Sequence, residues 1–341
     1  MPETPDPSFI NRKRLVRVDF TSDPAFGLAP QMRSVETLLR LGVIVLDKPA
    51  GPTSHQVAAW ARDILGISKA GHGGTLDPNV TGVLPVTLDL ATKAVGSLLY
   101  SSKEYVCMMK LHRDVKEERI RSVLSDFEDE IFQVPPLRSA VKRQQRSRRI
   151  YKLKVLEVEG RDVLFSAACQ AGTYIRTLCT DVGEVLGVGA HMQELRRIRT
   201  ARFTEDGAST LHDLKDAFVF WKEDHDEKPI RSVILPMEAI LSHLPAVIIR
   251  DGAVDAVCHG ARLAVPGLIA LDSGIGKGDR VAVFTAKGEG VALGLAELGS
   301  EAMIESNQGV AVTPDRILMP TGTYPKGWKT AEQRPAVKRS L

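Results

Sequence analysis

Asp77 is the residue of this sequence best placed to do chemistry. It stands near the end of the loop 71–78 (GHGGTLDP), whose glycines let the backbone adopt positive φ and pass close to another molecule. Pro78 disfavours a helical conformation at Asp77, which predicts a fixed, extended stretch carrying the carboxylate. Such an aspartate can be a metal ligand, a general acid or base, a helix cap or a turn residue, and the turn is the commonest of these for Asp-Pro.

Regular elements are predicted before this loop. The apolar run 43–46 breaks at residues 47–52 (DKPAGP), as a buried strand does when it enters a loop. Ser54 is expected to cap the next helix, whose apolar positions have helical spacing over 57–65. The loop that carries Asp77 should therefore start from a well-formed strand and helix.

Polar residues of interest also lie on predicted elements after the loop. Residues 105–111 alternate like a strand that begins at Tyr105. Residues 153–167 contain two strand-like runs around EGRD and predict a β-hairpin. Thr173 precedes a run with helical spacing and is expected to cap a helix with Arg176 on its first turn.

Five segments resemble those of one enzyme family, in the same order. Residues 71–85 (GHGGTLDPNVTGVLP) resemble the second motif of the TruB family of RNA pseudouridine synthases, in which the aspartate is the catalytic nucleophile. A match of this length is far more specific than a lone glycine motif. The other matching segments are 46–54 (LDKPAGPTS), 103–106 (KEYV), 171–178 (AGTYIRTL) and 191–197 (HMQELRR). Residues 321–328 and the arm before Leu41 resemble the archaeal, dyskerin-type branch, and the whole resemblance covers about residues 40–328.

The resemblance implies a catalytic role for three residues. Asp77 would be the nucleophile, Arg176 would pair with it and keep it ionised, and Tyr105 would stack on the target base and help to move its proton. A tyrosine on a strand is otherwise most often a core or interface residue.

Three further residues receive supporting roles from the resemblance. Leu195 would pack against the reacting nucleotide, although its spacing alone predicts ordinary core. Lys48 would support the active-site loop, with a solvated lysine as the alternative. His72 would occupy the space left by the extruded base, with a loop histidine bound to backbone as the alternative.

Charge is unevenly distributed along the chain, although its net value is only +3. Residues 138–154 contain eight basic residues and no acidic one, which predicts contacts with RNA phosphates. A solvated basic face is the alternative. The residues of this run assigned to RNA are Arg143, Arg146, Arg148, Arg149 and Lys152.

Short apolar runs separated by glycine follow Leu244 and predict a small β-barrel. Two runs, 281–284 and 291–295, flank KGEG (287–290) and predict a hairpin. Residues 260–267 and 287–294 resemble the PUA domain, a small RNA-binding barrel. This resemblance assigns Gly260, Pro266 and Gly267 to RNA contact.

The 341 residues exceed what one hydrophobic core usually organises, which predicts two domains. We expect an α+β protein. Residues 36–240 would be a pseudouridine-synthase domain with a mixed, largely antiparallel sheet and flanking helices, and 241–325 the PUA barrel. Residues 1–35 would be an N-terminal arm and 326–341 a basic tail.

Composition excludes some classes. No apolar run approaches the ~20 residues of a membrane helix, and residues 1–8 lack the features of a signal peptide, so we expect a cytoplasmic protein. The cysteines Cys107, Cys169, Cys179 and Cys258 show no CxxC spacing. This pattern favours buried thiols over zinc ligands or disulfides.

The resemblance implies isomerisation of uridine to pseudouridine in ribosomal RNA, with transfer RNA left open as a second substrate. The reaction changes no oxidation state, so no cofactor and no metal are expected. Dyskerin-type enzymes act with a box H/ACA guide RNA and three small proteins: a zinc-binding scaffold, a glycine-arginine-rich accessory protein and a kink-turn-binding ribosomal-type protein. One alternative is a stand-alone enzyme for the TΨC arm of transfer RNA, and another is a catalytically silent RNA-binding scaffold.

Overall fold

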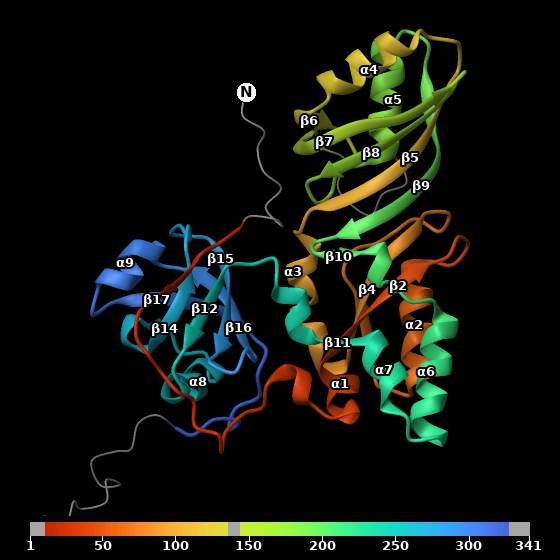
Figure 1. Cartoon of the computed structure of the whole chain (residues 1–341). Coiled ribbons are helices and arrows are strands. Elements are labelled where there is room, and N and C mark those ends of the chain that lie inside the picture. Colours follow the sequence, from red (N-terminus) through yellow and green to blue (C-terminus); the bar gives the residue numbers. More distant parts are fainter. Residues whose placement is uncertain (1–10, 136–143, 327–341) are drawn as a thin grey trace, which may run out of the picture. The chain divides into compact units, whose positions relative to one another are not determined.

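The computed structural model describes residues 11–135 and 144–326, which divide into two compact units (Figure 1). The first unit contains residues 35–135 and 144–235, and the second contains 11–34 and 236–326. Within these described ranges no helix is long and apolar enough to cross a membrane. Arg138, Lys142 and Arg143 of the basic run, and residues 327–341 of the predicted tail, lie outside them.

A ten-stranded sheet organises the first unit, in the order β11-β2-β4-β9-β5-β8-β7-β6, with β3 beside β4 and β10 beside β9. The pairing of β4 with β9 is parallel, whereas β2–β4, β5–β9, β5–β8, β7–β8 and β6–β7 are antiparallel. The predicted mixed, largely antiparallel sheet is thereby confirmed. Its strands are β2 (Gly42–Lys48), β3 (Ala70–His72), β4 (Thr81–Leu88), β5 (Lys103–Leu111), β6 (Asp129–Gln133), β7 (Arg146–Glu159), β8 (Asp162–Cys169), β9 (Ala190–Thr200), β10 (Phe203–Thr204) and β11 (Ile234–Pro236).

Helices cover this sheet in two groups, each with its own apolar core. Helices α4 and α5 lie on strands β5 to β9 (Figure 1), where Phe165 and Leu178 are fully buried. Helices α1, α2, α6 and α7 pack with β2 and β4 around residues such as Ile44 and Leu84. The helical segments are α1 (Val35–Leu41), α2 (Ser54–Leu65), η3 (Asp89–Ala94), α3 (Val95–Leu99), α4 (Glu117–Asp126), α5 (Ile175–Val185), η4 (Glu205–Gly207), α6 (Leu211–Glu223) and α7 (Glu227–Val233).

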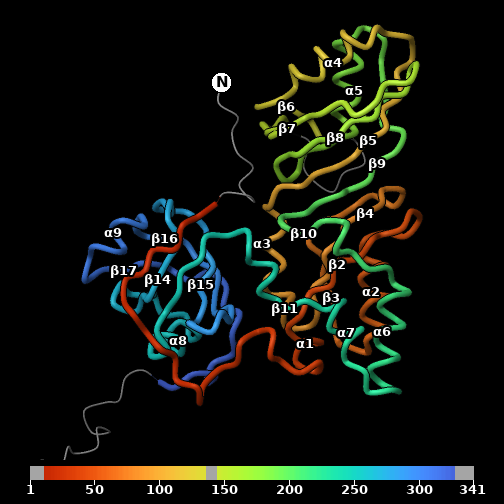
Figure 2. Tube along the Cα trace, in the orientation of Figure 1, coloured from red at the N-terminus to blue at the C-terminus, as the bar shows by residue number. Residues whose placement is uncertain are grey.

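The second unit is a seven-stranded sheet in the order β1-β14-β12-β15-β16-β17-β13, wrapped around one apolar core. The trace of β1 runs along β14 (Figure 2), and the predicted hairpin around residues 287–290 is confirmed by the pairing of β15 with β16. The elements are β1 (Arg14–Val16), η2 (Pro30–Met32), η5 (Met237–Leu241), β12 (Ala246–Ile249), α8 (Asp251–Cys258), β13 (Leu263–Ala264), η6 (Val265–Gly267), β14 (Leu268–Asp272), β15 (Arg280–Thr285), β16 (Gly290–Ala296), α9 (Ser300–Glu305) and β17 (Val310–Ile317).

The N-terminal segment 11–34 is held within the second unit by buried polar groups. The Glu289 carboxylate accepts hydrogen bonds from the Leu28 N–H at 3.1 Å, the Thr285 hydroxyl at 3.1 Å and the Tyr324 hydroxyl at 2.5 Å. Asp251 accepts from the hydroxyl of Ser22 at 2.9 Å. Since each buried carboxylate has several donors, the segment is fixed by specific bonds as well as by apolar packing.

Two predicted helix caps are wrong. Thr53, and not Ser54, precedes α2 in a capping box with Gln56, because the hydroxyl of Ser54 is engaged by another segment. Thr173 does not cap α5: its hydroxyl donates to the Gln170 carbonyl at 2.8 Å, and Tyr174 occupies the cap position without a side-chain bond. The predicted hairpin over residues 153–167 is confirmed as β7 and β8, and the four cysteines are buried and free, as predicted.

Candidate active site

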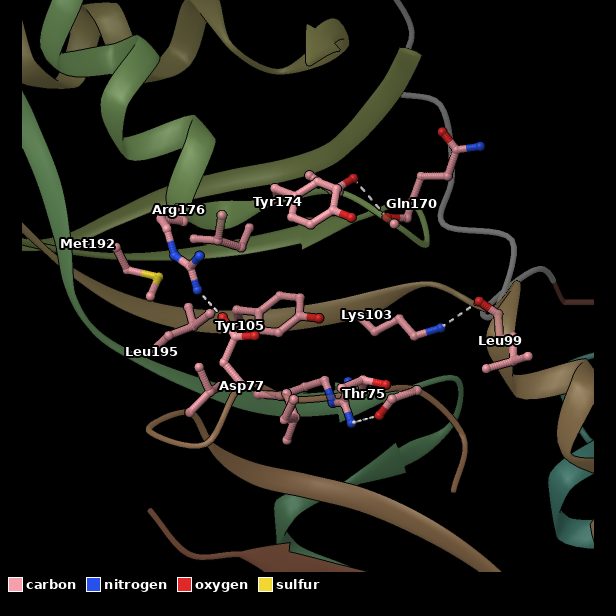
Figure 3. Close-up of a pocket in the computed structure, with 17 residues that line it drawn as sticks. Thr75, Asp77, Leu99, Lys103, Tyr105, Gln170, Tyr174, Arg176, Met192 and Leu195 are labelled. Carbon is pink, nitrogen blue, oxygen red and sulfur yellow. Dashed lines mark hydrogen bonds and ion pairs between the residues drawn. The ribbon is translucent and has the colours of Figure 1, made fainter. Parts of the chain in front are cut away.

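A cavity of about 390 Å³ opens in the first unit between the loop after β3, strands β5 and β9, and the start of α5 (Figure 3). Its volume lies in the ~300–1,000 Å³ range of small-ligand sites. Asp77, Tyr105, Arg176 and Leu195 all line it. The other lining residues are Gly74, Thr75, Leu76, Val80, Leu99, Lys103, Gln170, Gly172, Thr173, Tyr174, Ile175, Met192 and Arg197.

Asp77 and Arg176 form an ion pair in this cavity. The Nη2 group of Arg176 donates to Oδ2 of Asp77, and Figure 3 shows the guanidinium reaching from α5 toward the carboxylate. The two side chains are 44% and 54% exposed, so the pair faces open space. An arginine on the first turn of a helix opposes the helix dipole, a local cost that a charge-assisted bond offsets.

Lys48 fixes the backbone after Asp77. Its Nζ group is fully buried and donates to the carbonyl oxygens of Pro49, Pro78 and Val80, each at 2.9 Å. Burial lowers the pKa of Lys48, while the nearby charge of Asp77 raises it. An ammonium has three donors, and all three bond backbone carbonyls, two of which lie just after Asp77.

Ser54 fixes the backbone before Asp77. Its hydroxyl accepts from the Leu76 N–H at 2.8 Å and lies 3.1 Å from the Leu76 carbonyl, to which it donates. The Gly51 N–H adds a bond to the Pro78 carbonyl at 2.9 Å. Both flanks of Asp77 are therefore tied to the segment 48–54, which sequence reasoning identified as a separate motif.

Arg197 joins three walls of the cavity. Its side chain, in a residue only 1% exposed, donates from Nε to the Val83 carbonyl at 2.8 Å and from Nη2 to the Gly74 carbonyl at 3.1 Å. It stands opposite Tyr105 in the β5–β9 register. Burial raises the pKa of Tyr105, and the charge and hydrogen bond of Arg197 act in the opposite direction.

Gly82 allows β4 to approach β9 at this point. It pairs with Arg197 in the parallel register and has a φ of 101°. A Cβ atom there would lie 2.2 Å from the Arg197 carbonyl oxygen, so a side chain would displace the backbone that carries Arg197.

Lys103 forms a further buried part of the wall. Its Nζ group donates to the carbonyls of Leu98 and Ser101 at 2.7 Å and of Leu99 at 3.2 Å. Burial, together with the positive charge of Arg197, lowers the pKa of Lys103 to about 7. The turn at residues 98–101, which forms the rim of the cavity at Leu99, is thereby tied to β5.

Known proteins match the chain over most of its length. The model of the N-terminal domain of TruB family pseudouridylate synthases matches residues 62–175, and that of the tRNA pseudouridylate synthase B C-terminal domain matches 176–242. A probable tRNA pseudouridine synthase B of Methanopyrus kandleri is 56% identical over 318 residues, 93% of this chain and 94% of that protein. The chain belongs to the TruB family of pseudouridine synthases.

The remaining matches place it in the archaeal, dyskerin-type branch of the TruB family. The PUA model matches residues 245–318 and the DKCLD model residues 10–58. A Pyrococcus abyssi relative is 53% identical over 94% of this chain and 97% of its own length. A chain in the crystal structure of a Cbf5-Nop10-Gar1 complex is 53% identical with a TM-score of 0.91, covering 94% of this chain and 98% of that one. A chain of an H/ACA RNP bound to a substrate RNA containing 2'-deoxyuridine is 50% identical, with a TM-score of 0.88. The match covers 94% of this chain and 99% of that one.

His72 does not line the cavity of this TruB family member. It lies on β3 beside Val86 of β4, with its ring edge-on to that of His55 at a centroid distance of 4.6 Å. Burial, and then the charges of His55 and Arg197, lower the pKa of His72 to about 4. The imidazole is therefore neutral near pH 7.

Four of the five basic residues assigned to RNA in the run before Lys154 lie on β7. Arg148 is placed next to the cavity, since its Nε lies 3.2 Å from the Cβ position of Gly172. Arg149 pairs with Asp129 at 3.1 Å. Arg146 and Lys152 lie on the same strand, whereas Arg143 is outside the described residues.

The three residues assigned to RNA in the PUA domain lie in the second unit, close to α8. Gly260 follows that helix and is exposed, as is Pro266. Gly267 lies against it: a Cβ there would be 3.2 Å from that of Ala253.

Sequence reasoning assigned no role to Lys103 or Arg197. The alternation of side chains along a strand could have indicated both residues, because residues i and i+2 of a strand point to the same face. Lys103 precedes Tyr105 by two positions on β5, and Arg197 follows Leu195 by two positions on β9. Each therefore faces the cavity beside a residue that the family motifs had already indicated.

Proposed function

We propose that this pseudouridine synthase isomerises uridine in ribosomal RNA as the catalytic subunit of a cytoplasmic H/ACA guide-RNA particle. The observation that carries the proposal is the Asp77–Arg176 ion pair inside a cavity lined by Tyr105 and Leu195. A fixed carboxylate, a cation beside it, and an aromatic and an aliphatic side chain for a base form a set suited to nucleophilic chemistry on a nucleotide.

The reaction breaks the bond between N1 and the sugar, rotates the base, joins C5 to the sugar and releases the C5 proton. Asp77 serves as the nucleophile, and Arg176 holds its carboxylate in place through the ion pair. Tyr105 stacks on the base and helps to move the proton, while Leu195 packs against the nucleotide. N1 takes up a proton in place of its bond to the sugar, so the product is an isomer of uridine and the reaction needs no oxidant or reductant.

The target base must leave its stack to reach Asp77. The basic residues of β7 bind phosphates and so position the RNA without reading its sequence. His72 fills the space that the base vacates, a role that suits a neutral ring. Gly260, Pro266 and Gly267 bind RNA through the PUA domain.

A box H/ACA guide RNA selects the target uridine, and the particle contains three small proteins. They are a zinc-binding scaffold, a glycine-arginine-rich accessory protein and a kink-turn-binding ribosomal-type protein. Two similar structures support this assembly, since one is of a Cbf5-Nop10-Gar1 complex and the other of an H/ACA RNP bound to a substrate RNA. Similarity at 50–53% identity over 94% of the chain makes the same assembly the best-supported one here.

Release of tritium from C5-tritiated uridine tests the proposal. The substrates are a ribosomal RNA fragment and a transfer RNA, each with and without a matching guide RNA and the three proteins. Release that requires the guide and disappears in Asp77→Asn supports the assignment. Asn79→Asp, two positions away in the same loop, is the matched control and should keep its activity.

A stand-alone transfer RNA enzyme is the second candidate, favoured by the names of the archaeal relatives. Guide-independent release confined to transfer RNA would support it. Release that survives Asp77→Asn would contradict the nucleophile assignment, and tight RNA binding without any release would favour a scaffold.

A further inference from the structure

Helix α5 carries Arg176 but begins without a cap of its own. Tyr174 occupies the cap position and makes no side-chain cap bond, and the hydroxyl of Thr173 is committed to Gln170. The first N–H groups of a helix have no partner inside it. Apolar packing of Ile175 and Leu178 holds the body of α5 in the core, and the backbone that leads into its first turn needs polar partners from outside the helix.

Gln133, the last residue of β6, supplies that group. Its amide Nε2 donates to the Tyr174 carbonyl at 3.0 Å, and its Oε1 accepts from the Tyr174 N–H at 2.9 Å. A primary amide is both donor and acceptor, so one side chain matches both polar groups of one backbone residue. Gln133 is 3% exposed, which shields both bonds from competing water.

We propose that Gln133 is a positioning residue for the reaction: its amide fixes the Tyr174 backbone and so aims the first turn of α5 at Asp77. The inference rests on the proposed function. Because the side chains of Arg176 and Asp77 are half exposed, packing around the ion pair does little to hold it. The position of Arg176 depends instead on the backbone of Tyr174, two residues before it. Gln133, on β6, bonds that backbone.

Hydrogen exchange tests the clamp without any need for activity. In Gln133→Met, which retains the length and volume of the side chain but neither bond, the amides of Tyr174 to Leu178 should exchange at least about tenfold faster, while those of α2 keep their rates. The matched control is Gln193→Met, since Gln193 is exposed on β9 of the same sheet. Unchanged exchange at the start of α5 would overturn the clamp.

Single-turnover rates in the reconstituted particle test the positioning role. Gln133→Met should lower the rate about 10- to 100-fold, the range expected for a small misplacement of a catalytic group, with substrate affinity within about twofold of wild type. Gln133→Glu keeps the acceptor but loses the donor, and it should also lower the single-turnover rate. It serves as the test variant if Gln133→Met folds poorly. An unchanged rate in both variants would overturn the role.

A double-mutant cycle separates positioning from general destabilisation. If Gln133 acts through Arg176, Gln133→Met should cost less than about twofold in an Arg176→Lys background. An equal loss in both backgrounds would contradict the inference. A wild-type particle without activity would instead refute the proposed function, and the exchange measurement would still decide whether the clamp exists.

Discussion

The two members of the Asp77–Arg176 pair are held in different ways. Asp77 lies in a loop whose backbone is bonded before it by Ser54 and after it by Lys48. Arg176 lies on the first turn of α5, and the side chain of Gln133 bonds both backbone groups of Tyr174, the residue before that helix. The backbone on both sides of Asp77 is thus bonded to residues of the segment 48–54, whereas the backbone before Arg176 is bonded to one residue of β6.

This difference predicts that the Asp77 loop is more rigid than the start of α5. The Asp77 loop has few ways to move, because a shift would leave several buried carbonyls without donors. The start of α5 can tilt once two bonds are lost. Changes on the Asp77 side should therefore reduce both stability and rate, whereas changes at Gln133 should act mainly on rate.

Lys48→Met should have the largest effect. It removes the Lys48 donor from the carbonyls of Pro49 and Val80 and leaves that of Pro78 with the Gly51 N–H alone. We expect a loss of about 2–4 kcal/mol in the free energy of unfolding, given ~1–3 kcal/mol for an unpaired buried group. The rate should fall about 100-fold or more as Asp77 loses its placement. Urea unfolding and single-turnover assays measure the two effects. Lys69→Met, at an exposed site, is the control. A Lys48→Met variant that is inactive but as stable as wild type would contradict the expectation that changes on the Asp77 side reduce both stability and rate.

Arg197→Lys should have a somewhat smaller effect. A lysine keeps the charge but cannot reach Val83, Gly74 and Tyr105 together, because it lacks the planar fork of the guanidinium. We expect about a tenfold to thirtyfold lower rate and a loss of about 1–2 kcal/mol in unfolding free energy, roughly one buried hydrogen bond. The pH profile of the rate supplies an independent check, since Tyr105 loses a partner that lowers its pKa. An unaltered profile would show that Arg197 supports the wall without influencing Tyr105.

The sequence predicted most of the elements that build the site, because their signals are local. The strand before residue 47, the glycine loop and the helix that carries Arg176 each show a clear period or breaker within about fifteen residues. The family motifs then identified Asp77, Tyr105, Arg176 and Leu195, and the structure brings these four residues to one cavity.

The connections between elements could not be predicted in the same way. Gln133 bonds to a residue 41 positions later, and Arg197 bonds to one 114 positions earlier. Such bonds depend on which strands become neighbours, and no local pattern encodes that order. The wrong caps at Ser54 and Thr173 have the same cause, because each hydroxyl had a tertiary or turn partner that outcompeted the helix N–H groups.

Ser54→Ala should have a smaller effect that sharpens the comparison on the Asp77 side. It removes the bonds to the N–H and carbonyl of Leu76 but leaves Lys48 in place, and Thr53 still caps α2. We expect a loss of about 1–2 kcal/mol in unfolding free energy and a rate reduced about threefold to tenfold. Thr53→Ala is the matched control, because it should lower stability through the helix cap by about 1 kcal/mol with little change in rate. Equal rates in the two variants would show that Ser54 stabilises α2 and does not position Asp77.

Lys103 should contribute to stability by an amount that depends on pH. Its pKa is about 7 in the folded protein and 10.5 in the unfolded chain, so between these values the unfolded state binds more protons and stability rises with pH. The unfolding free energy of wild type relative to Lys103→Met should therefore increase by about 1 kcal/mol per pH unit from pH 7.5 to 9.5. Urea unfolding at each pH measures it, with Lys93→Met as a control that should show no such slope. If the unfolding free energy of wild type relative to Lys103→Met does not change with pH, the three carbonyl acceptors outweigh burial and keep the ammonium charged. Lys103 would then support the backbone in the same way as Lys48.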